Sequence, residues 1–314
     1  MADNPAGSTA VAAAPGIRSD PGGRPGGRVR SVARAARRLA GVVPFTVYVL
    51  AGLLVPTVAV AVGAFQNSET GQFTLSNIQV ATHGIYLQGF RQSIELSLLS
   101  ALIPGVVGLL IAYAIHTAQR ASVLRRVAIT ASGVFANFGG VPLAFLFIAS
   151  LGTTGIVTGW LKALGFDIYA GRFSLFTFTG VLLAYMYFPI PLMVLVILPA
   201  LEGLRPTWRE AAQNMGAGTW QYWRYVGGPV LAPAFLGCLL LLFGSAFAAY
   251  ATANEMTAGA LALTPIQIGT FLNGNVLAGQ ENVGKALGLG MVIIIGVVMI
   301  IYSLLQRRAA RWLQ

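Results

Sequence analysis

The sequence predicts an all-α integral membrane protein with six transmembrane helices and a polar loop between the fourth and the fifth. Of the 314 residues, 56% are hydrophobic and only 9% are charged, whereas about a quarter of the residues in an ordinary soluble domain carry charge. So few charges cannot cover a surface that faces water. In a bilayer the apolar runs must form helices, because each backbone polar group has to be satisfied within its own segment.

Six apolar runs are long enough to cross a hydrocarbon core, which takes about 20 helical residues. The predicted spans cover residues 41–65, 93–116, 127–151, 173–198, 230–253 and 285–306. Pro104, Pro142, Pro189 and Pro191 fall inside these runs, where each removes a backbone donor and favours a kink. Kinks suit a transporter whose helices rearrange, but proline is also frequent in membrane helices generally, and both interpretations stay open.

The two ends of the chain are basic. Residues 1–40 are rich in Ala, Gly, Pro and Arg without an apolar period, which predicts a disordered cytoplasmic tail; residues 41–306 form the six-span domain, and residues 307–314 a basic cytoplasmic end. With both termini inside, sixteen of the twenty Lys and Arg residues are cytoplasmic, as the positive-inside rule requires. The net charge of +11 therefore reflects cytoplasmic loops rather than a nucleic-acid surface. The first span would also be compatible with a cleaved signal peptide, except that its apolar run is longer than a usual signal core.

The loop after the fourth predicted span reads RPTWREAAQNMGAGTWQYWRYVGGPVLAP. Thr207 and Glu210 have the spacing of a capping box, which predicts a helix that starts directly after Thr207. Gly216 is a natural left-handed terminator for that helix. A second short helix is expected to start after Thr219 and to end before Gly227.

The composition of this loop favours a contact surface. Alanines allow close approach of another backbone, and Trp, Tyr and Met are residue types that anchor interfaces. The members of this set are Trp208, Ala211, Ala212, Met215, Trp220, Tyr222 and Trp223. The loop is thus either a docking surface for a cytoplasmic partner or an amphipathic hairpin that rests in lipid headgroups, and the residues alone do not decide between them.

A family resemblance favours docking. The run Glu210-Ala211-Ala212, followed by Gly216 and then by Val226, Gly228 and Pro229, resembles the EAA loop of permease subunits of bacterial binding-protein-dependent ABC importers. The resemblance covers about residues 90–306 and includes the six-span layout and the position of the loop before the penultimate span. It departs at Gly228, where the family usually has Leu before the proline.

The resemblance implies a permease in the bacterial cytoplasmic (inner) membrane whose loop is a coupling helix seated on an ATPase subunit. It implies two ATPase subunits that bind ATP and magnesium, a second permease subunit, an extracytoplasmic solute-binding protein, and no cofactor in this chain. The residues expected to dock the ATPase are Thr207, Glu210, Ala211, Ala212, Met215, Gly216, Val226 and Pro229. Glu210 would both cap the helix and meet a polar or basic group of the ATPase.

The resemblance also leans toward one branch of the family. Met215 stands where sugar importers commonly carry Asp, and the segment NFGGVPLAF (137–145) looks more like permeases for polyamines, ferric iron or phosphonates. A small charged solute is therefore expected, with a sugar as the alternative.

Polar groups inside the spans are the candidates for the solute pathway, because they are costly in lipid unless they face a cavity or a neighbour. These residues are Asn137, Tyr185, Tyr187, Tyr250, Asn254 and Glu255. The alternative is that they form interhelical hydrogen bonds or interfacial aromatic belts. The outer segments 66–92, 152–172 and 254–284 are the expected contacts for a binding protein.

Other chemistry finds little support in the sequence. His83 and His116 are isolated and Cys238 lies in an apolar run, so no metal site or disulfide is predicted. Gly279 to Ala286 resembles a phosphate loop, but Ala286 replaces the Ser or Thr that binds magnesium, and no strand precedes it. The sequence shows no catalytic constellation of the kind that an intramembrane enzyme would need. A stand-alone transporter or channel remains the alternative function, although no inverted repeat is evident.

Overall fold

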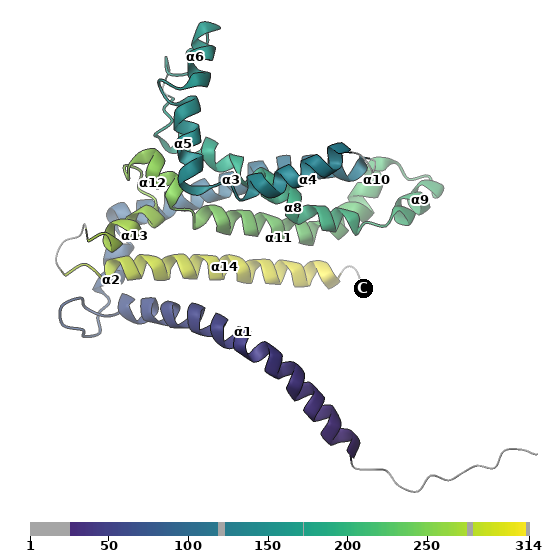
Figure 1. Ribbon diagram of the computed structural model, residues 1–314, viewed down its shortest axis with the longest axis horizontal. Helices are drawn as coiled ribbons and strands as arrows, with labels where there is room; N and C mark the ends of the chain where they lie inside the picture. The colour runs from purple at the N-terminus through teal and green to yellow at the C-terminus, as the bar shows by residue number, and fades with distance from the viewer. Residues whose placement is uncertain (1–25, 119–122, 172, 275–278, 312–314) are drawn as a thin grey trace, which may run out of the picture. The chain divides into compact units, whose positions relative to one another are not determined.

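The computed structural model describes residues 26–118, 123–171, 173–274 and 279–311 (Figure 1). Its helices are α1 (Gly26–Ala64), α2 (Ser76–Ala81), α3 (Gly84–Thr117), α4 (Val123–Ala136), α5 (Gly140–Leu151), α6 (Ile156–Ala163), α7 (Phe178–Tyr187), α8 (Pro189–Glu202), α9 (Pro206–Asn214), α10 (Thr219–Tyr222), the π-helix η1 (Trp223–Gly227), α11 (Gly228–Phe247), α12 (Ala251–Thr257), α13 (Thr264–Leu272) and α14 (Val283–Arg311). Over these ranges the only extended pairing is an isolated bridge between Gln66 and Phe73. The all-α prediction is confirmed.

Six stretches of helix are long and apolar enough to cross a membrane. They are Val43–Ala64, Gly84–Thr117, Gly140–Ala163, Phe178–Glu202, Thr219–Phe247 and Val283–Leu304. This confirms the predicted number of spans. The chain divides into two compact units, residues 1–56 and 57–314, and the description below concerns the second.

The third predicted span, residues 127–151, is wrong as a single helix. The structure breaks it into α4 and α5 at residues 137–139, and Gly140 has a φ of +70°. Two consecutive glycines permit this left-handed step, and Pro142 then sits in the first turn of α5, where its missing N–H has no helical partner to lose. The apolar stretch continues through α6, which lies inside the segment 152–172 that we expected to be an outer loop.

Other boundaries also differ from the prediction. Helix α1 begins at Gly26, inside the tail that we expected to be disordered, because Ala and Arg favour helix there. The rest of the predicted tail, residues 1–25, and residues 312–314 lie outside the described part. The fourth span consists of α7 and α8, and Pro189 opens α8. The fifth ends at Phe247, not at residue 253, and α12 follows after a break.

The core of the second unit forms where α3 packs against α8 and α11. One face of α3 carries small residues, which let neighbouring helices approach closely. A Cβ atom at Gly108 would lie 2.6 Å from the Cβ of Met193 and 2.8 Å from the carbonyl oxygen of Ile190, so only glycine fits this crossing. Met193 and Leu242 are fully buried in the same cluster.

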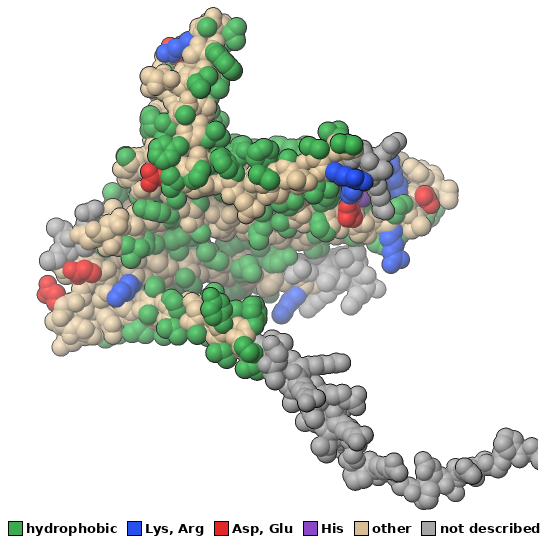
Figure 2. Space-filling view, in the orientation of Figure 1, with side chains coloured by type: hydrophobic (Ala, Val, Ile, Leu, Met, Phe, Trp, Pro, Cys, Tyr) green, Lys and Arg blue, Asp and Glu red, His purple; other side chains and the backbone are tan. Residues whose placement is uncertain are grey.

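The short helices collect at the two ends of the long ones. Helices α9 and α10 lie at one end of α8 and α11, and α12 and α13 lie at the other (Figure 1). Figure 2 shows Lys and Arg side chains near the α9 end and apolar side chains along the helices between. The fold thus separates a basic end, which carries the predicted docking loop, from an end that carries the last of the predicted pathway residues.

Candidate functional site

The loop between α8 and α11 starts its first helix without the predicted capping box. The N-cap of α9 is Arg205, and no side chain caps the helix there. Pro206 occupies the first helical position, where its ring pre-sets φ and its missing N–H removes one orphan donor. Thr207 therefore lies inside the helix, and the prediction that Thr207 and Glu210 cap each other is wrong.

The end of α9 follows the prediction at Gly216. This glycine has a φ of +80°, the left-handed conformation of a helix terminator. Its N–H donates to the carbonyl of Gln213 at 2.9 Å, and the N–H of Ala217 donates to the carbonyl of Ala212 at 2.9 Å. Helix α10 then begins at Thr219, one residue before the predicted start, and the Gln221 side chain accepts a 2.8 Å hydrogen bond from the N–H of Gly218.

The exit from the loop is continuous helix rather than a joint, so the predicted end before Gly227 is wrong. The backbone passes from α10 through the π-helix η1 into α11. At Gly228, where the resembling family usually has Leu, a Cβ atom would lie 2.5 Å from the carbonyl oxygen of Trp223. Glycine at this position allows the wider turn to form.

The predicted docking residues divide into an exposed face and a buried anchor. Trp208 (36% exposed), Ala211 and the C-cap Met215 (81% exposed) recur at three- and four-residue spacing and form one exposed side of α9, next to the buried Ala212. Ala212 is only 5% exposed and packs within the chain. Thr207, Glu210, Gly216 and Pro229 are exposed, and Val226 is half-buried. A partner could therefore reach Ala211 but not Ala212.

The second candidate region is a junction of two helix breaks, Asn137–Gly139 between α4 and α5 and Ala248–Tyr250 between α11 and α12. The Tyr185 hydroxyl on α7 donates to the carbonyl of Ala249 at 2.8 Å, and the Thr252 hydroxyl on α12 donates to the carbonyl of Gly140 at 3.1 Å. The first bond satisfies a carbonyl that the end of α11 leaves without a helical partner. The second ties the start of α5 to α12.

The predicted pathway residues gather around this junction but differ in exposure. Tyr185 is fully buried, and Tyr187 packs edge-on against the rings of Phe135 and Phe147, each at 6.1 Å. The Asn137 amide is exposed and donates to the carbonyl of Gly133 at 2.9 Å, four residues back in the same turn of chain.

The remaining three predicted residues lie along α12. Tyr250 is its N-cap, and the N–H of Asn254 donates to the carbonyl of Tyr250 at 2.9 Å, so the four-residue spacing holds on α12 rather than on a continued fifth span. Asn254 is half-buried and Glu255 is exposed. Tyr185 therefore has the role of an interhelical hydrogen-bond donor, whereas Tyr250 faces open space.

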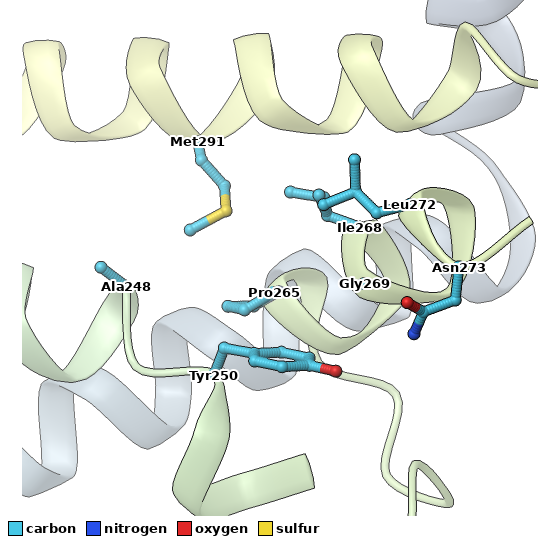
Figure 3. A pocket seen from close by; sticks show the side chains of 8 residues that line it. All are labelled: Ala248, Tyr250, Pro265, Ile268, Gly269, Leu272, Asn273 and Met291. Atoms are coloured by element: carbon cyan, nitrogen blue, oxygen red, sulfur yellow. The ribbon is translucent and has the colours of Figure 1, made fainter. Parts of the chain in front are cut away.

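That space is a cavity of about 380 Å³ beside the second break (Figure 3). Its residues come from the α11–α12 break, from α13 and from α14: Ala248, Tyr250, Pro265, Ile268, Gly269, Leu272, Asn273 and Met291. The Tyr250 ring lies over Gly269, where a Cβ atom would be 2.7 Å from the ring, and its hydroxyl and the Asn273 amide lie on the same side of the cavity. The cavity combines a mostly apolar wall with two neutral hydrogen-bonding groups.

Sequence reasoning missed Thr252, Asn273 and Met291. Thr252 and Met291 lie in apolar runs where no motif distinguishes them from their neighbours. Asn273 falls in a segment that we expected to be an outer connection. Among the described residues, no group of three His, Cys, Asp or Glu side chains is placed to hold a metal ion. The segment from Gly279 to Ala286 is a turn that leads into α14, and residues 275–278 before it lie outside the description.

Comparisons with known proteins place these features in context. No protein-family model matches the chain. It is 26% identical over 207 residues to a probable sulfate transport system permease protein, cysT, of Nephroselmis olivacea, which covers 65% of this chain and 67% of that protein. It is 35% identical to the sulfate transport system permease protein CysT of Escherichia coli K12 over 33% of this chain and 34% of that protein.

A further relative is the thiamine transport system permease protein ThiP of Escherichia coli K12, at 31% identity over 34% of this chain and 20% of that protein. The chain thus spans about a third or less of the length of these two bacterial relatives. All three are transport permeases and not enzymes.

Solved structures share the fold. A bacterial ABC transporter involved in the import of the acidic polysaccharide alginate superposes with a TM-score of 0.69 at 18% identity, covering 89% of this chain and 98% of that one. The MetNI methionine ABC transporter superposes with a TM-score of 0.53 at 14% identity, covering 73% and 97%. The chain is thus similar in sequence to transport system permease proteins and similar in fold to subunits of ABC transporters.

Proposed function

We propose that the chain is the membrane subunit of an ATP-driven importer in the bacterial cytoplasmic membrane, and that α9 is its coupling helix. The observation that carries this proposal is one side of α9, where Trp208, Ala211 and Met215 are exposed beside Ala212, which is buried within the chain. Exposed aromatic and Met side chains around a small residue suit a groove in another protein.

In this proposal two ATPase subunits bind ATP and magnesium, and this chain handles neither. A second permease subunit, expected to be a different chain, completes the pathway, and an extracytoplasmic binding protein delivers the solute. The alginate transporter has been solved in complex with an alginate pentasaccharide-bound periplasmic protein, which supports a partner of that kind. Because α10, η1 and α11 form one continuous helix after the turn at Gly216, a movement of the loop that displaces α10 would pass directly into α11.

The docking proposal is tested by a matched set of aspartates on α9. The full-length chain is purified from its native host in mild detergent, and stoichiometric partners are identified by mass spectrometry. Ala211→Asp would place an unpaired carboxylate in the contact, so we expect ATPase recovery to fall more than tenfold. Gln213→Asp adds the same charge on the opposite side of α9 and should leave recovery unchanged.

Two results would contradict docking through this face. One is equal ATPase recovery with Ala211→Asp and Gln213→Asp. The other is a chain that purifies alone and carries solute into liposomes without ATP, which would favour a stand-alone transporter or channel.

We further propose that the solute is a small charged molecule, with a sulfate-like oxyanion as the first candidate. The earlier lean toward polyamines and ferric iron finds no support in the relatives reported above, which are named for sulfate and thiamine. Neutral donors such as the Tyr250 hydroxyl and the Asn273 amide can bind an oxyanion without the desolvation cost of a buried counter-charge.

This substrate proposal is tested by transport into proteoliposomes that contain the assembled importer. We expect uptake of sulfate but not of spermidine or glucose, and a drop of about fivefold or more in uptake with the double variant Tyr250→Phe and Asn273→Ala, because each lost hydrogen bond contributes about 1 kcal/mol. Thr270→Ala, an exposed residue of α13 outside the cavity, is the control. Unchanged sulfate uptake in the double variant would exclude the cavity from the pathway.

A further inference from the structure

A second cavity, of about 330 Å³, lies at the root of the loop and differs in character from the first. Its lining combines the end of α3, the start of α9 and the start of the α10–η1 helix. The lining residues are Tyr113, His116, Thr117, Leu204, Arg205, Pro206, Arg209, Tyr222 and Trp223. None of these described lining residues is acidic, and two are arginines.

The aromatic part of the lining is fixed by its own packing. The Trp223 ring meets the Tyr113 ring edge-on at 5.4 Å and the Tyr222 ring edge-on at 5.7 Å. Tyr222 is buried, and Tyr113 and His116 are half-buried. The cavity therefore has a preformed aromatic wall against which a ligand can be held.

The basic part of the lining is open to solvent. Arg205 and Arg209 are both exposed and stand one helical turn apart, so both guanidinium groups can turn toward the same site. Nearby, Glu202 is already occupied by Arg125, with which it forms an ion pair. The positive charge at the cavity is thus available for a ligand, and the His116 imidazole adds a further polar group to the lining.

The cavity lies beside the ends of two helices that are long and apolar enough to cross a membrane. It is bounded by Thr117, the last residue of one predicted membrane-spanning helix, and by Leu204, two residues after the end of another at Glu202. Both helices, of 34 and 25 residues, are longer than the roughly 20 residues that cross the hydrocarbon core, so their ends can reach the headgroup layer, where lipid phosphates are found. Basic pockets between membrane helices at this depth bind anionic headgroups.

We propose that this cavity is a binding site for a phosphate-type anion, held by Arg205 and Arg209. Guanidinium groups match phosphate oxygens with paired hydrogen bonds. The inference needs neither an ATPase nor a transported solute. The anion is either the headgroup of an anionic phospholipid or a soluble oxyanion.

The test uses the full-length chain in detergent, titrated with phosphatidylglycerol, with phosphatidylcholine as the uncharged comparison, and separately with inorganic phosphate. Native mass spectrometry measures lipid retention, and calorimetry measures phosphate binding. For the double variant Arg205→Gln and Arg209→Gln, we expect affinity to fall about fivefold per arginine, which corresponds to about 1 kcal/mol for each basic group. Arg224→Gln removes one charge from the same loop outside the cavity and is the matched control.

The outcomes separate the two sources. Selective loss of phosphatidylglycerol retention in the double variant, without phosphate binding by the native chain, assigns the site to lipid. Phosphate binding that the double variant loses assigns it to a soluble anion. If the double variant weakens neither anion more than Arg224→Gln does, the proposal is overturned. The single thiol, Cys238, is buried, so its continued resistance to a maleimide verifies that each variant is folded.

Discussion

Tyr185 shows how a single hydroxyl supports a break in a membrane helix. The side chain is fully buried, and its hydroxyl donates to the carbonyl of Ala249, the residue that follows the end of α11 by two positions. Without this donor the carbonyl would be left unpaired away from water. A buried acceptor without a partner destabilises a protein by about 1–3 kcal/mol.

We therefore predict that Tyr185→Phe lowers the free energy of unfolding by about 1–3 kcal/mol. The measurement is the midpoint of thermal unfolding in detergent, followed through exposure of the buried thiol of Cys238. Tyr187→Phe is the control, because it keeps the edge-on contacts with Phe135 and Phe147 and is expected to shift the midpoint little. Equal midpoints for the two variants would contradict the role assigned to Tyr185.

For single residues, the sequence predicted which side chains are important better than it predicted what each of them does. The polarity of Tyr185 and Tyr250 in apolar surroundings singled out both, but only coordinates separate a buried donor from a residue that lines a cavity. The capping box failed because Pro206, which precedes Thr207, starts the helix earlier than the Thr and Glu spacing indicated. The prediction at Gly216 succeeded because a left-handed helix end favours glycine, which adopts a positive φ without steric cost.

The elements around the junction are joined by a second hydroxyl. Thr252 on α12 is only 3% exposed and donates to the carbonyl of Gly140, the first residue of α5. This bond links two helices that are 112 positions apart in the chain. It holds the start of α5 against α12, where the two breaks meet.

We predict that Thr252→Val loosens this link with little change in volume. The free energy of unfolding should fall by about 1 kcal/mol, and amide hydrogens in the first turn of α5 should exchange faster in hydrogen–deuterium exchange. Thr257→Val is the matched control on the same helix. Its hydroxyl donates to the carbonyl of Ala253 four residues back on α12, so its loss breaks no link between helices and should have less effect. Faster exchange in α5 with the control alone would contradict the prediction.

At the element scale, six apolar runs were enough to predict six spans, because hydropathy over about 20 residues is a strong signal. The break between α4 and α5 was missed, because Gly139 and Gly140 interrupt a run whose hydropathy does not change there. Breaks are set by backbone conformation and by donors from other helices, such as Thr252, and neither appears in a hydropathy profile.

For the whole molecule, the distribution of Lys and Arg predicts which end faces the cytoplasm. Trp220 on α10 and Leu272 at the end of α13 are both highly exposed and lie on opposite ends of the long helices. Single cysteines at these positions, in a Cys238→Ala background, report the orientation of the fold. The positive-inside rule predicts that the α10 end is cytoplasmic.

We predict that Leu272→Cys reacts with a membrane-impermeant maleimide in intact spheroplasts, and that Trp220→Cys reacts only after the membrane is permeabilised. The ratio of labelling before and after permeabilisation is the measurement. The reverse pattern would place the loop outside and would exclude docking of a cytoplasmic ATPase. The Cys238→Ala chain without a new cysteine should remain unlabelled throughout.

The uninterrupted helix that leaves the loop has a geometric consequence. Thr219–Phe247 contains 29 residues, which at about 1.5 Å per residue gives roughly 40 Å. A hydrocarbon core is only about 30 Å thick. When it lies close to the membrane normal, this helix is longer than the hydrocarbon core by roughly 10 Å, which is about the combined thickness of the two headgroup layers. The Thr219 end of this helix can therefore extend beyond the hydrocarbon core, so a protein that binds there can remain in the aqueous phase.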